Sequence, residues 1–265
     1  MSTEDLVAKL ARRYTRDAEA YRELWAPELL PLGRRLLDLT DLSEARRVID
    51  IGAGVGALAP YERLAAPRAT VVLADRAEGM LRLAQTDIPR VLVDARSLPF
   101  PAGTFDAVIM AFVLFHVPEP TDALAEITRI LRTGGSLALA TWGESRPRAA
   151  MAAWIEELDA HGAGEDEPSL AHHERMDTEA KVEALLGFAK LGVERVQTVR
   201  SEHPVTVERF VAMRTRIGEA SRRLRTLDRS RRAACLERAV ARIEGMDPRE
   251  LVDDTDAILA VARRP

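Results

Sequence analysis

The stretch of this sequence with the clearest chemical meaning covers residues 48–56 and reads Val-Ile-Asp-Ile-Gly-Ala-Gly-Val-Gly. Its β-branched residues are typical of a buried parallel strand, and its alternating glycines let the backbone turn sharply with no Cβ between it and a ligand. Such a turn delivers free N–H groups to a cofactor at the start of the following helix. The stretch therefore predicts a nucleotide-cofactor loop.

Two classes of cofactor fit this glycine spacing. Gly52-x-Gly54-x-x-Ala57 satisfies the dinucleotide fingerprint, and Asp75 lies far enough along the chain to hold a ribose hydroxyl. Asp50, just before the glycines, suits a cationic cofactor such as S-adenosylmethionine (AdoMet) and would repel a pyrophosphate. The aspartate therefore favours AdoMet over a dinucleotide.

Two other groups of residues invite a different chemistry. In His172-His173-Glu174 the adjacent side chains point apart, and no second cluster stands at metal-ligand spacing. The arginines near residues 222–232 alternate with acidic residues, and no aromatic residue follows Phe210 to stack on bases. The sequence therefore favours neither a metal site nor a nucleic-acid surface.

Composition and length limit the class of protein. A chain of 265 residues with 47% hydrophobic content can bury a full core and fits one α/β domain with additions. The formal net charge of −4 gives no attraction to nucleic acid or to an anionic membrane. The single cysteine, Cys235, excludes an internal disulfide, and neither a signal-peptide pattern nor an apolar run of membrane-spanning length is present. We therefore expect a cytoplasmic protein with no membrane partner.

The elements that must position the cofactor loop follow from hydrophobic periodicity. Residues 4–40 are predicted to form helices with an apolar leucine face, and after them strands alternate with helices up to residue 141. This alternation predicts a doubly wound parallel sheet with right-handed crossovers. The helix after Pro118 is expected to stop at Gly134-Gly135. The predicted strands cover residues 47–51, 70–74, 90–93, 105–112 and 136–141, and the helices between them begin near 57, 78 and 119.

Beyond Trp142 the pattern is mostly helical again. A helix ending at His161-Gly162 is followed by a polar loop over 163–176 and by a helix ending at Gly192. The remaining chain is read as a strand near 193–200, two or three helices in 206–247 and a last strand over 256–262. We therefore divide one domain into an N-terminal helical lid (1–42), a cofactor-binding core (43–145) and a C-terminal part (146–265) whose insertion at about 206–247 forms a cap.

Several ordered stretches resemble motifs of the class I AdoMet-dependent methyltransferases, in particular the small-molecule group similar to menaquinone and ubiquinone C-methyltransferases. The resemblance covers about residues 46–142 and implies a Rossmann-like seven-stranded sheet whose last strand is antiparallel. Ala53 stands where the family usually has cysteine, a position that mainly concerns size. The stretches are 48–56; 71–75 with 79–81; 93–95 with 98–101 and 105–106; 112–118; and 129–137.

The resemblance implies roles for residues around the first two motifs. Asp50 would complement the cationic cofactor, and Gly52, Ala53 and Gly54 would approach its methionine and ribose parts. Asp75 would accept hydrogen bonds from both ribose hydroxyls. An acidic residue at the end of a strand fits this role, because ligands of open α/β sheets lie beyond the carboxyl ends of the strands.

The resemblance also implies contacts for the adenine and the reacting sulfonium. Met80 would pack on the adenine, Asp94 would accept from its amino group, and the backbone at Ala95 would meet its ring edge. Ala111 and Phe112 would face the sulfonium. AdoMet is thus the expected cofactor and S-adenosylhomocysteine (AdoHcy) the expected product.

A catalytic residue is not required by this chemistry. Methyl transfer from a sulfonium is an in-line displacement, so alignment and water exclusion matter most, and a base is needed only if the nucleophile must lose a proton. His116 is the best candidate base, because its loop borders the transfer site in the family. A structural or cofactor-contacting role for His116 stays open. The other histidines, at 161, 172, 173 and 203, are interpreted as surface or capping residues.

The acceptor is expected to be a small organic molecule, because the fourth motif lacks the Asn/Asp-Pro-Pro-Tyr/Phe signature of methyltransferases that act on base amino groups. Its pocket should lie beneath the N-terminal helices and the cap, and such a variable cap suits secondary metabolism. About two of six aromatic residues should face it: Tyr14, Tyr21, Trp25, Trp142, Trp154 and Phe210. Whether oxygen, nitrogen or carbon is methylated, and whether the protein is a monomer or a homodimer, stays open. An NAD-dependent oxidoreductase and a non-catalytic AdoMet-binding protein are the alternatives.

Overall fold

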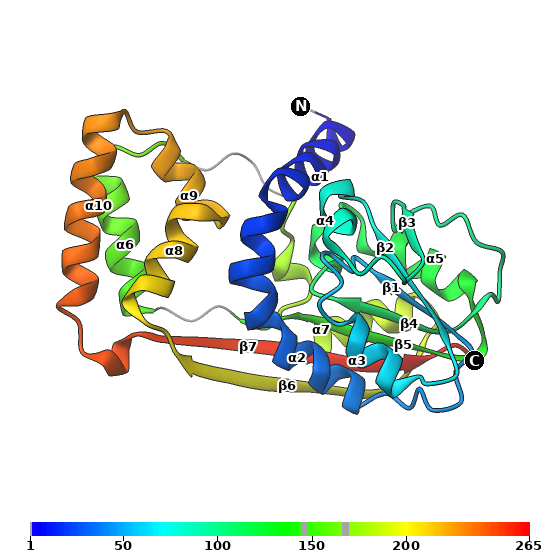
Figure 1. Ribbon diagram of the computed structural model, residues 1–265. Helices are drawn as coiled ribbons and strands as arrows, with labels where there is room; N and C mark the ends of the chain where they lie inside the picture. The colour runs from blue at the N-terminus through cyan, green and yellow to red at the C-terminus, as the bar shows by residue number, and fades with distance from the viewer. Residues whose placement is uncertain (1, 145–147, 166–169) are drawn as a thin grey trace.

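The predicted alternation of strands and helices forms a mixed sheet with the strand order β3-β2-β1-β4-β5-β7-β6 (Figure 1). The computed structural model describes residues 2–144, 148–165 and 170–265, without the side chains of 201–204, 248 and 252–255. β1 to β5 pair in parallel, and β7 is antiparallel to both β5 and β6. The seven-stranded fold with an antiparallel last strand is therefore confirmed. The strands are β1 (Arg47–Ile51), β2 (Thr70–Asp75), β3 (Arg90–Leu92), β4 (Phe105–Ala111), β5 (Leu131–Trp142), β6 (Gly192–Pro204) and β7 (Val252–Arg263).

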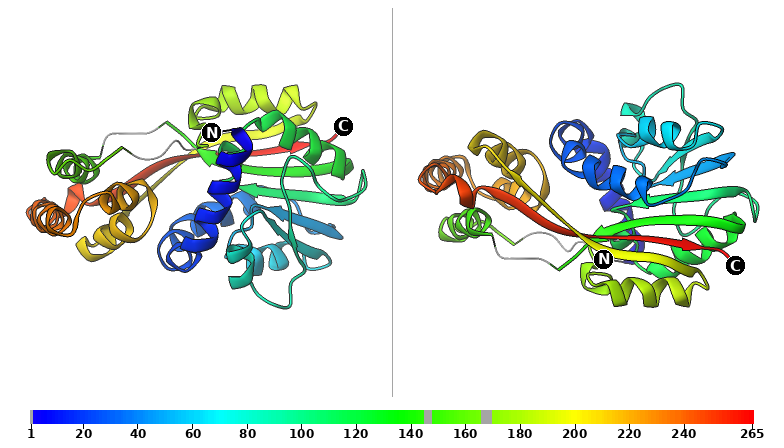
Figure 2. Two further views of the ribbon diagram at one scale, coloured as in Figure 1. Left: turned by 90° about the horizontal axis from the view of Figure 1, so that it is seen from above. Right: turned by 90° about the horizontal axis from the view of Figure 1, so that it is seen from below.

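Burial on both faces explains the unbroken apolar character of the central strands. Val48 and Ile49 of β1 are fully buried, and Val48 pairs with Val71 of β2 and Ala107 of β4. Helices α5 and α7 cover one face of the sheet, and α2, α3 and α4 cover the other (Figure 2). These helices are α2 (Ala26–Asp38), α3 (Ala59–Ala65), α4 (Glu78–Leu83), α5 (Pro120–Ile130) and α7 (Glu179–Phe188).

Two predicted helix ends were wrong for the same reason. α5 ends at Ile130 rather than at Gly134-Gly135, because the next residue, Leu131, is fully buried and pairs with Phe105 as the first residue of β5. Gly134, at φ +75°, instead lies at the irregularity where β5 resumes its pairing. α7 ends at Phe188, four residues before Gly192. A glycine that serves a strand or a turn gives the same sequence signal as a helix cap.

The N-terminal helices cross the carboxyl edge of the sheet. α1 (Thr3–Ala20) continues through a π-helical turn (Tyr21–Trp25) into α2. α1 packs closely on α4 at Gly79, whose N–H donates to Thr15 Oγ1 at 3.2 Å. A Cβ on Gly79 would lie 2.4 Å from the Thr15 carbonyl oxygen, so only glycine permits this approach. The lid is thereby held against the core.

The cap stands apart from the sheet and is carried by a ribbon of two long strands. β7 pairs with β5 only as far as Ala257, whereas its pairing with β6 continues to Val252, and the paired strands run on toward the cap (Figure 1). Trp154 and Phe210 belong to a separate apolar core inside the cap. The cap contains α6, which packs on α10, in addition to the inserted helices: α6 (Ala149–Ala160), α8 (Val207–Arg216), α9 (Gly218–Arg225) and α10 (Arg229–Glu244).

Short 3₁₀ turns complete the described secondary structure at Leu114–His116, His173–Arg175 and Pro248–Glu250. The predicted polar loop over 163–176 contains residues 166–169, which lie outside the described residues. Among the helices that the structure describes, none is long and apolar enough to cross a membrane.

Candidate active site

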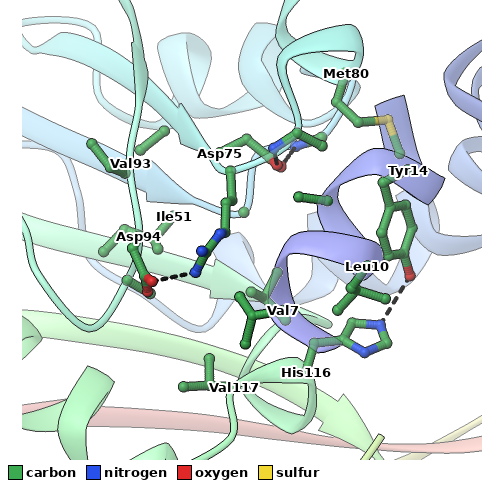
Figure 3. A pocket seen from close by; sticks show the side chains of 18 of the residues that line it. Val7, Leu10, Tyr14, Ile51, Asp75, Met80, Val93, Asp94, His116 and Val117 are labelled. Carbon is green, nitrogen blue, oxygen red and sulfur yellow. Dashed lines mark hydrogen bonds and ion pairs between the residues drawn. The ribbon is translucent and has the colours of Figure 1, made fainter. Parts of the chain in front are cut away.

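A cavity of about 860 Å³ lies beyond the carboxyl ends of β1, β2 and β4, with α1 along one side (Figure 3). Two predicted site residues, Asp50 and Ala53, line instead a neighbouring cavity of about 460 Å³, which shares the wall at Gly52 and Phe112. The structure thus gathers residues of four motifs and of the lid in one place. The predicted residues that line the larger cavity are Gly52, Gly54, Asp75, Met80, Asp94, Ala95, Ala111, Phe112 and His116.

The glycine turn after β1 requires the residues that form it. Gly52 and Gly54 have φ values of +78° and +57°, which disfavour any residue with a Cβ. A Cβ on Gly52 would also lie 2.1 Å from a methyl group of Val113. The backbone of the turn can therefore lie directly against a ligand in the cavity.

Asp75 ties the glycine turn to β2 and keeps acceptor capacity for a ligand. Its two carboxylate oxygens accept hydrogen bonds from Gly54 N–H at 2.8 Å and from Ala77 N–H at 2.7 Å. Burial raises the pKa of Asp75, and these backbone donors oppose the shift. Each oxygen can accept a further bond, which is what a ribose diol requires.

Asp94 is bound by two arginines that the sequence analysis did not single out. Arg96 donates to it from its guanidinium at 2.7 Å, and Arg76 forms a second ion pair with it (Figure 3). Burial raises the pKa of Asp94, but the Arg96 hydrogen bonds outweigh burial and hold it below its usual value. Arg96 also donates to Glu4 of α1 at 2.8 Å, so this ion cluster fastens the lid beside the cavity. These ion pairs could have been suspected from the sequence, because Arg76 follows Asp75 and Arg96 stands two residues after Asp94.

Asp50 has a buried acidic neighbour that the sequence analysis also missed. Asp50 is 3% exposed, and Glu62 of α3 is 0% exposed beside it. Burial raises the pKa of both carboxyl groups, and the nearby Asp50 charge raises that of Glu62 further. The structure therefore places a pair of carboxyl groups behind the glycine turn.

A second cavity, of about 1120 Å³, adjoins the first. Tyr14, Tyr21, Phe112 and His116 line both cavities and so form the boundary that the two cavities share, which is called the window below. Of the six aromatic residues proposed for the acceptor pocket, four line the second cavity: Tyr14, Tyr21, Trp25 and Trp142.

The other two aromatic residues, Trp154 and Phe210, are not among the residues that line the second cavity. Trp154 and Phe210 pack edge to face, with ring centroids 5.9 Å apart, inside the core of the cap. They are therefore candidates that belong to a core rather than to the second cavity, because helical spacing of an aromatic residue does not say which core its helix faces.

Phe112 occupies the window in a strained conformation. Its φ of +60° is rare for a bulky residue, and its N–H donates to the Ala140 carbonyl at 2.8 Å. Its ring centroid lies 4.4 Å from that of Trp142. Strain of this kind persists only where surrounding contacts hold it, and it concentrates at functional sites.

His116 is hydrogen-bonded through both ring nitrogens. Nε2 lies 2.9 Å from Tyr14 Oη, and Nδ1 lies 3.3 Å from the Leu170 carbonyl oxygen (Figure 3). Burial lowers the pKa of His116 to about 3, so the imidazole is neutral. Burial also raises the pKa of the Tyr14 phenol, which therefore keeps its proton. In this arrangement neither nitrogen of His116 faces an acceptor directly, and its role as a base stays a prediction.

The remaining histidines differ in position. His173 lines the second cavity and stacks on Phe115 with ring centroids 4.3 Å apart. His161 closes α6 by bonding the Glu157 carbonyl at 2.7 Å, and His172 is near Glu174. The side chain of His203 lies outside the described residues. The described ranges contain no group of three or more His, Cys, Asp or Glu side chains that could hold a metal ion.

A family model described as a methyltransferase domain matches residues 49–139. The match runs from β1 into β5 and includes the glycine turn, Asp75, Asp94 and the end of β4. The family match therefore covers the strands that line the first cavity and leaves out the lid and the cap.

Curated relatives match part of the chain. The ubiquinone/menaquinone biosynthesis C-methyltransferase UbiE of Pseudomonas entomophila is 37% identical over an alignment of 114 residues that covers 39% of this chain and 44% of that protein. The demethylmenaquinone methyltransferase of Thermus thermophilus is 38% identical over an alignment of 111 residues that covers 39% of this chain and 50% of that protein. The chain thus aligns with about half or less of the length of these relatives.

Solved structures share the fold over most of the chain. A putative methyltransferase from Bacillus halodurans has a TM-score of 0.56 at 20% identity and covers 87% of this chain and 97% of its own. The [4+2]-cyclase SpnF also has a TM-score of 0.56 at 20% identity, covering 89% of this chain and 80% of its own. The family match and these relatives together favour AdoMet over a dinucleotide. Residues 49–139 therefore form a class I AdoMet-dependent methyltransferase domain, and this core is similar to that of the ubiquinone/menaquinone C-methyltransferases.

Proposed function

We propose that this protein transfers a methyl group from AdoMet to a small organic acceptor held in the second cavity. The observation that carries the proposal is the junction of two cavities. One is lined by the cofactor motifs and the other by aromatic side chains, and they meet at Tyr14, Tyr21, Phe112 and His116. An in-line displacement requires donor and acceptor on opposite sides of such a passage.

The residues of the first cavity, which is lined by the cofactor motifs, fit AdoMet. Gly52 leaves a cradle that a Cβ would fill, and Asp75 has acceptor capacity suited to a ribose diol. Met80 offers an apolar surface for an adenine, and Ala111 and Phe112 would stand beside the sulfonium. Bound AdoMet would supply an activated methyl group. The protein's own contribution would be alignment, together with exclusion of water by α1 and the aromatic window.

The acceptor is proposed from the second cavity rather than from the relatives. The name of the UbiE relative assigns it C-methylation in ubiquinone and menaquinone biosynthesis, but its similarity covers only 39% of this chain. The cavity wall is largely aromatic, so it suits an acceptor with a planar or apolar body. Because SpnF shares the fold, the fold by itself does not fix the reaction.

Calorimetry with AdoMet, AdoHcy and NAD tests the cofactor. We expect the wild type to bind AdoMet and AdoHcy but not NAD. Asp50→Asn should weaken AdoMet binding, because a cationic cofactor beside Asp50 would favour its ionised form despite burial, and the variant cannot carry this charge. Asp38→Asn changes the same charge at an exposed position and serves as the control. Binding of NAD without AdoMet would contradict the proposal.

Transfer itself is tested with methyl-labelled AdoMet and a small-molecule extract of the source organism. A labelled small product supports the proposal and identifies the acceptor. AdoMet binding with no labelled product from any extract indicates a non-catalytic AdoMet-binding protein instead.

A further inference from the structure

Tyr14 is the residue of the lid that reaches the window. It lies on α1, lines both cavities, and points its hydroxyl at His116 of the loop after β4 (Figure 3). Its hydrogen bond to His116 joins the lid to the core at the window. The orientation of this hydroxyl is therefore central to what the window can recognise.

The direction of the Tyr14–His116 hydrogen bond follows from the third partner. The Leu170 carbonyl can only accept, so Nδ1 of His116 carries the ring proton. Neutral imidazole then leaves Nε2 as an acceptor, and the Tyr14 O–H donates to it across 2.9 Å. The proton of Tyr14 is thus committed to His116, and the lone pairs of its oxygen are left for another donor.

The charged side chains that line the second cavity give it no net attraction for a ligand of either sign. Arg13 and Arg222 line it together with Asp17 and Glu219, so the two signs of charge are balanced. The window itself is made of neutral rings. A neutral acceptor whose ring packs against Phe112 is thereby favoured, because aromatic rings prefer offset or edge contacts with one another.

We infer that Tyr14 binds the hydroxyl group of the methyl acceptor, which is a neutral aromatic compound carrying a hydroxyl at the window. The Tyr14 oxygen accepts the acceptor's O–H, and this bond places the acceptor oxygen beside the passage to the cofactor cavity. His116 is a positioning residue that holds Tyr14 in this orientation. The inference rests on the proposed function and adds the chemical class of the acceptor.

Equilibrium dialysis of 2-naphthol and 2-fluoronaphthalene against the AdoHcy-loaded full-length protein tests the inference. The two probes have similar shapes, but only the first can donate a hydrogen bond. We expect the wild type to bind 2-naphthol about threefold to tenfold more tightly, the ratio for one net hydrogen bond. Tyr14→Phe should bind both probes equally, at the wild-type affinity for 2-fluoronaphthalene.

Tyr61→Phe is the matched control, because it also removes one tyrosine hydroxyl but Tyr61 is not among the residues that line the two cavities, so the preference should be unchanged. His116→Gln retains an acceptor for the Tyr14 hydroxyl and should keep more of the preference than His116→Leu, a difference that a purely structural role would not produce. A wild type that does not prefer 2-naphthol, or a Tyr14→Phe variant that still does, overturns the inference. Failure to bind AdoMet or AdoHcy overturns the proposed function itself and is measured separately by calorimetry.

Discussion

At His116, burial and hydrogen bonding decide what chemistry the imidazole can do. The sequence placed a histidine beside the predicted transfer site, where an ordinary pKa would make it a base at neutral pH. The fold lowers that pKa to about 3 and engages both nitrogens with Tyr14 and Leu170. The residue type was predictable, but its protonation state depends on neighbours from distant segments.

The low pKa of His116 predicts a pH dependence of stability. The unfolded chain binds a proton at His116 below pH 6.5, and the folded chain does not until about pH 3, so the wild type loses stability as pH falls through this range. Relative to His116→Gln, the wild type should lose about 2 kcal/mol between pH 7 and pH 5. Urea denaturation of both proteins at each pH measures this, and the subtraction cancels other titrating groups. An identical pH dependence in the two proteins would show that His116 is not buried in this state.

At the scale of single elements, the turn after β1 depends on glycine for two separate reasons. Gly52 combines a positive φ with a position pressed against Val113, whereas Gly162 has a positive φ of +73° with nothing within 4 Å of its missing Cβ. The two positions therefore separate backbone strain from steric overlap.

Alanine substitutions at these glycines should differ in cost. Gly162→Ala should lower the free energy of unfolding by about 1 kcal/mol, from backbone strain alone. Gly52→Ala should lower it by about 2 to 4 kcal/mol, because overpacking is added. Adding Val113→Ala should restore part of the loss at Gly52. Urea denaturation measures all of these, and equal losses at Gly52 and Gly162 would contradict the steric account.

At the scale of the whole molecule, the N-terminal helices connect the core to the cap. Tyr14 is hydrogen-bonded to His116, and Glu4 accepts from Arg96. Both core residues line the first cavity. From the cap, Arg209 donates to the Leu24 carbonyl at 2.9 Å and pairs with Glu28, and Arg216 pairs with Glu23. The lid is therefore fastened to both the core and the cap, and we expect these contacts to open when a ligand enters beneath it.

Hydrogen exchange should report this coupling. The first cavity is lined from α1 by Val7, Leu10, Ala11 and Tyr14, so a bound cofactor should stabilise the closed lid. With AdoHcy at 100 times its Kd, amides of α1 that exchange through lid opening should slow by about a hundredfold. Amides of α10, in the cap, should not change. Slower exchange at the glycine turn with no change in α1 would show that ligands enter by another route.

The parallel strands of the sheet, the glycine turn and the position of Asp75 at the end of a strand could be predicted from the sequence. These follow from local patterns, because buried parallel strands read as continuous apolar runs and their carboxyl ends meet at one edge. It was therefore possible to predict from the sequence that residues at the ends of these strands lie close together. Helix ends at Gly134 and Gly192 were misplaced, because strands and turns use glycine as well.

Only the tertiary structure decided the partners of these residues. Tyr14 and His116 are 102 positions apart, and Glu4 and Arg96 are 92 apart, so no local pattern links them. Trp154 faces the core of the cap instead of the acceptor cavity. Such contacts depend on how separate helices pack on one another. The proposed cofactor residues therefore lie mainly at the ends of strands, whereas the proposed acceptor cavity is formed where the lid, the cap and the sheet meet.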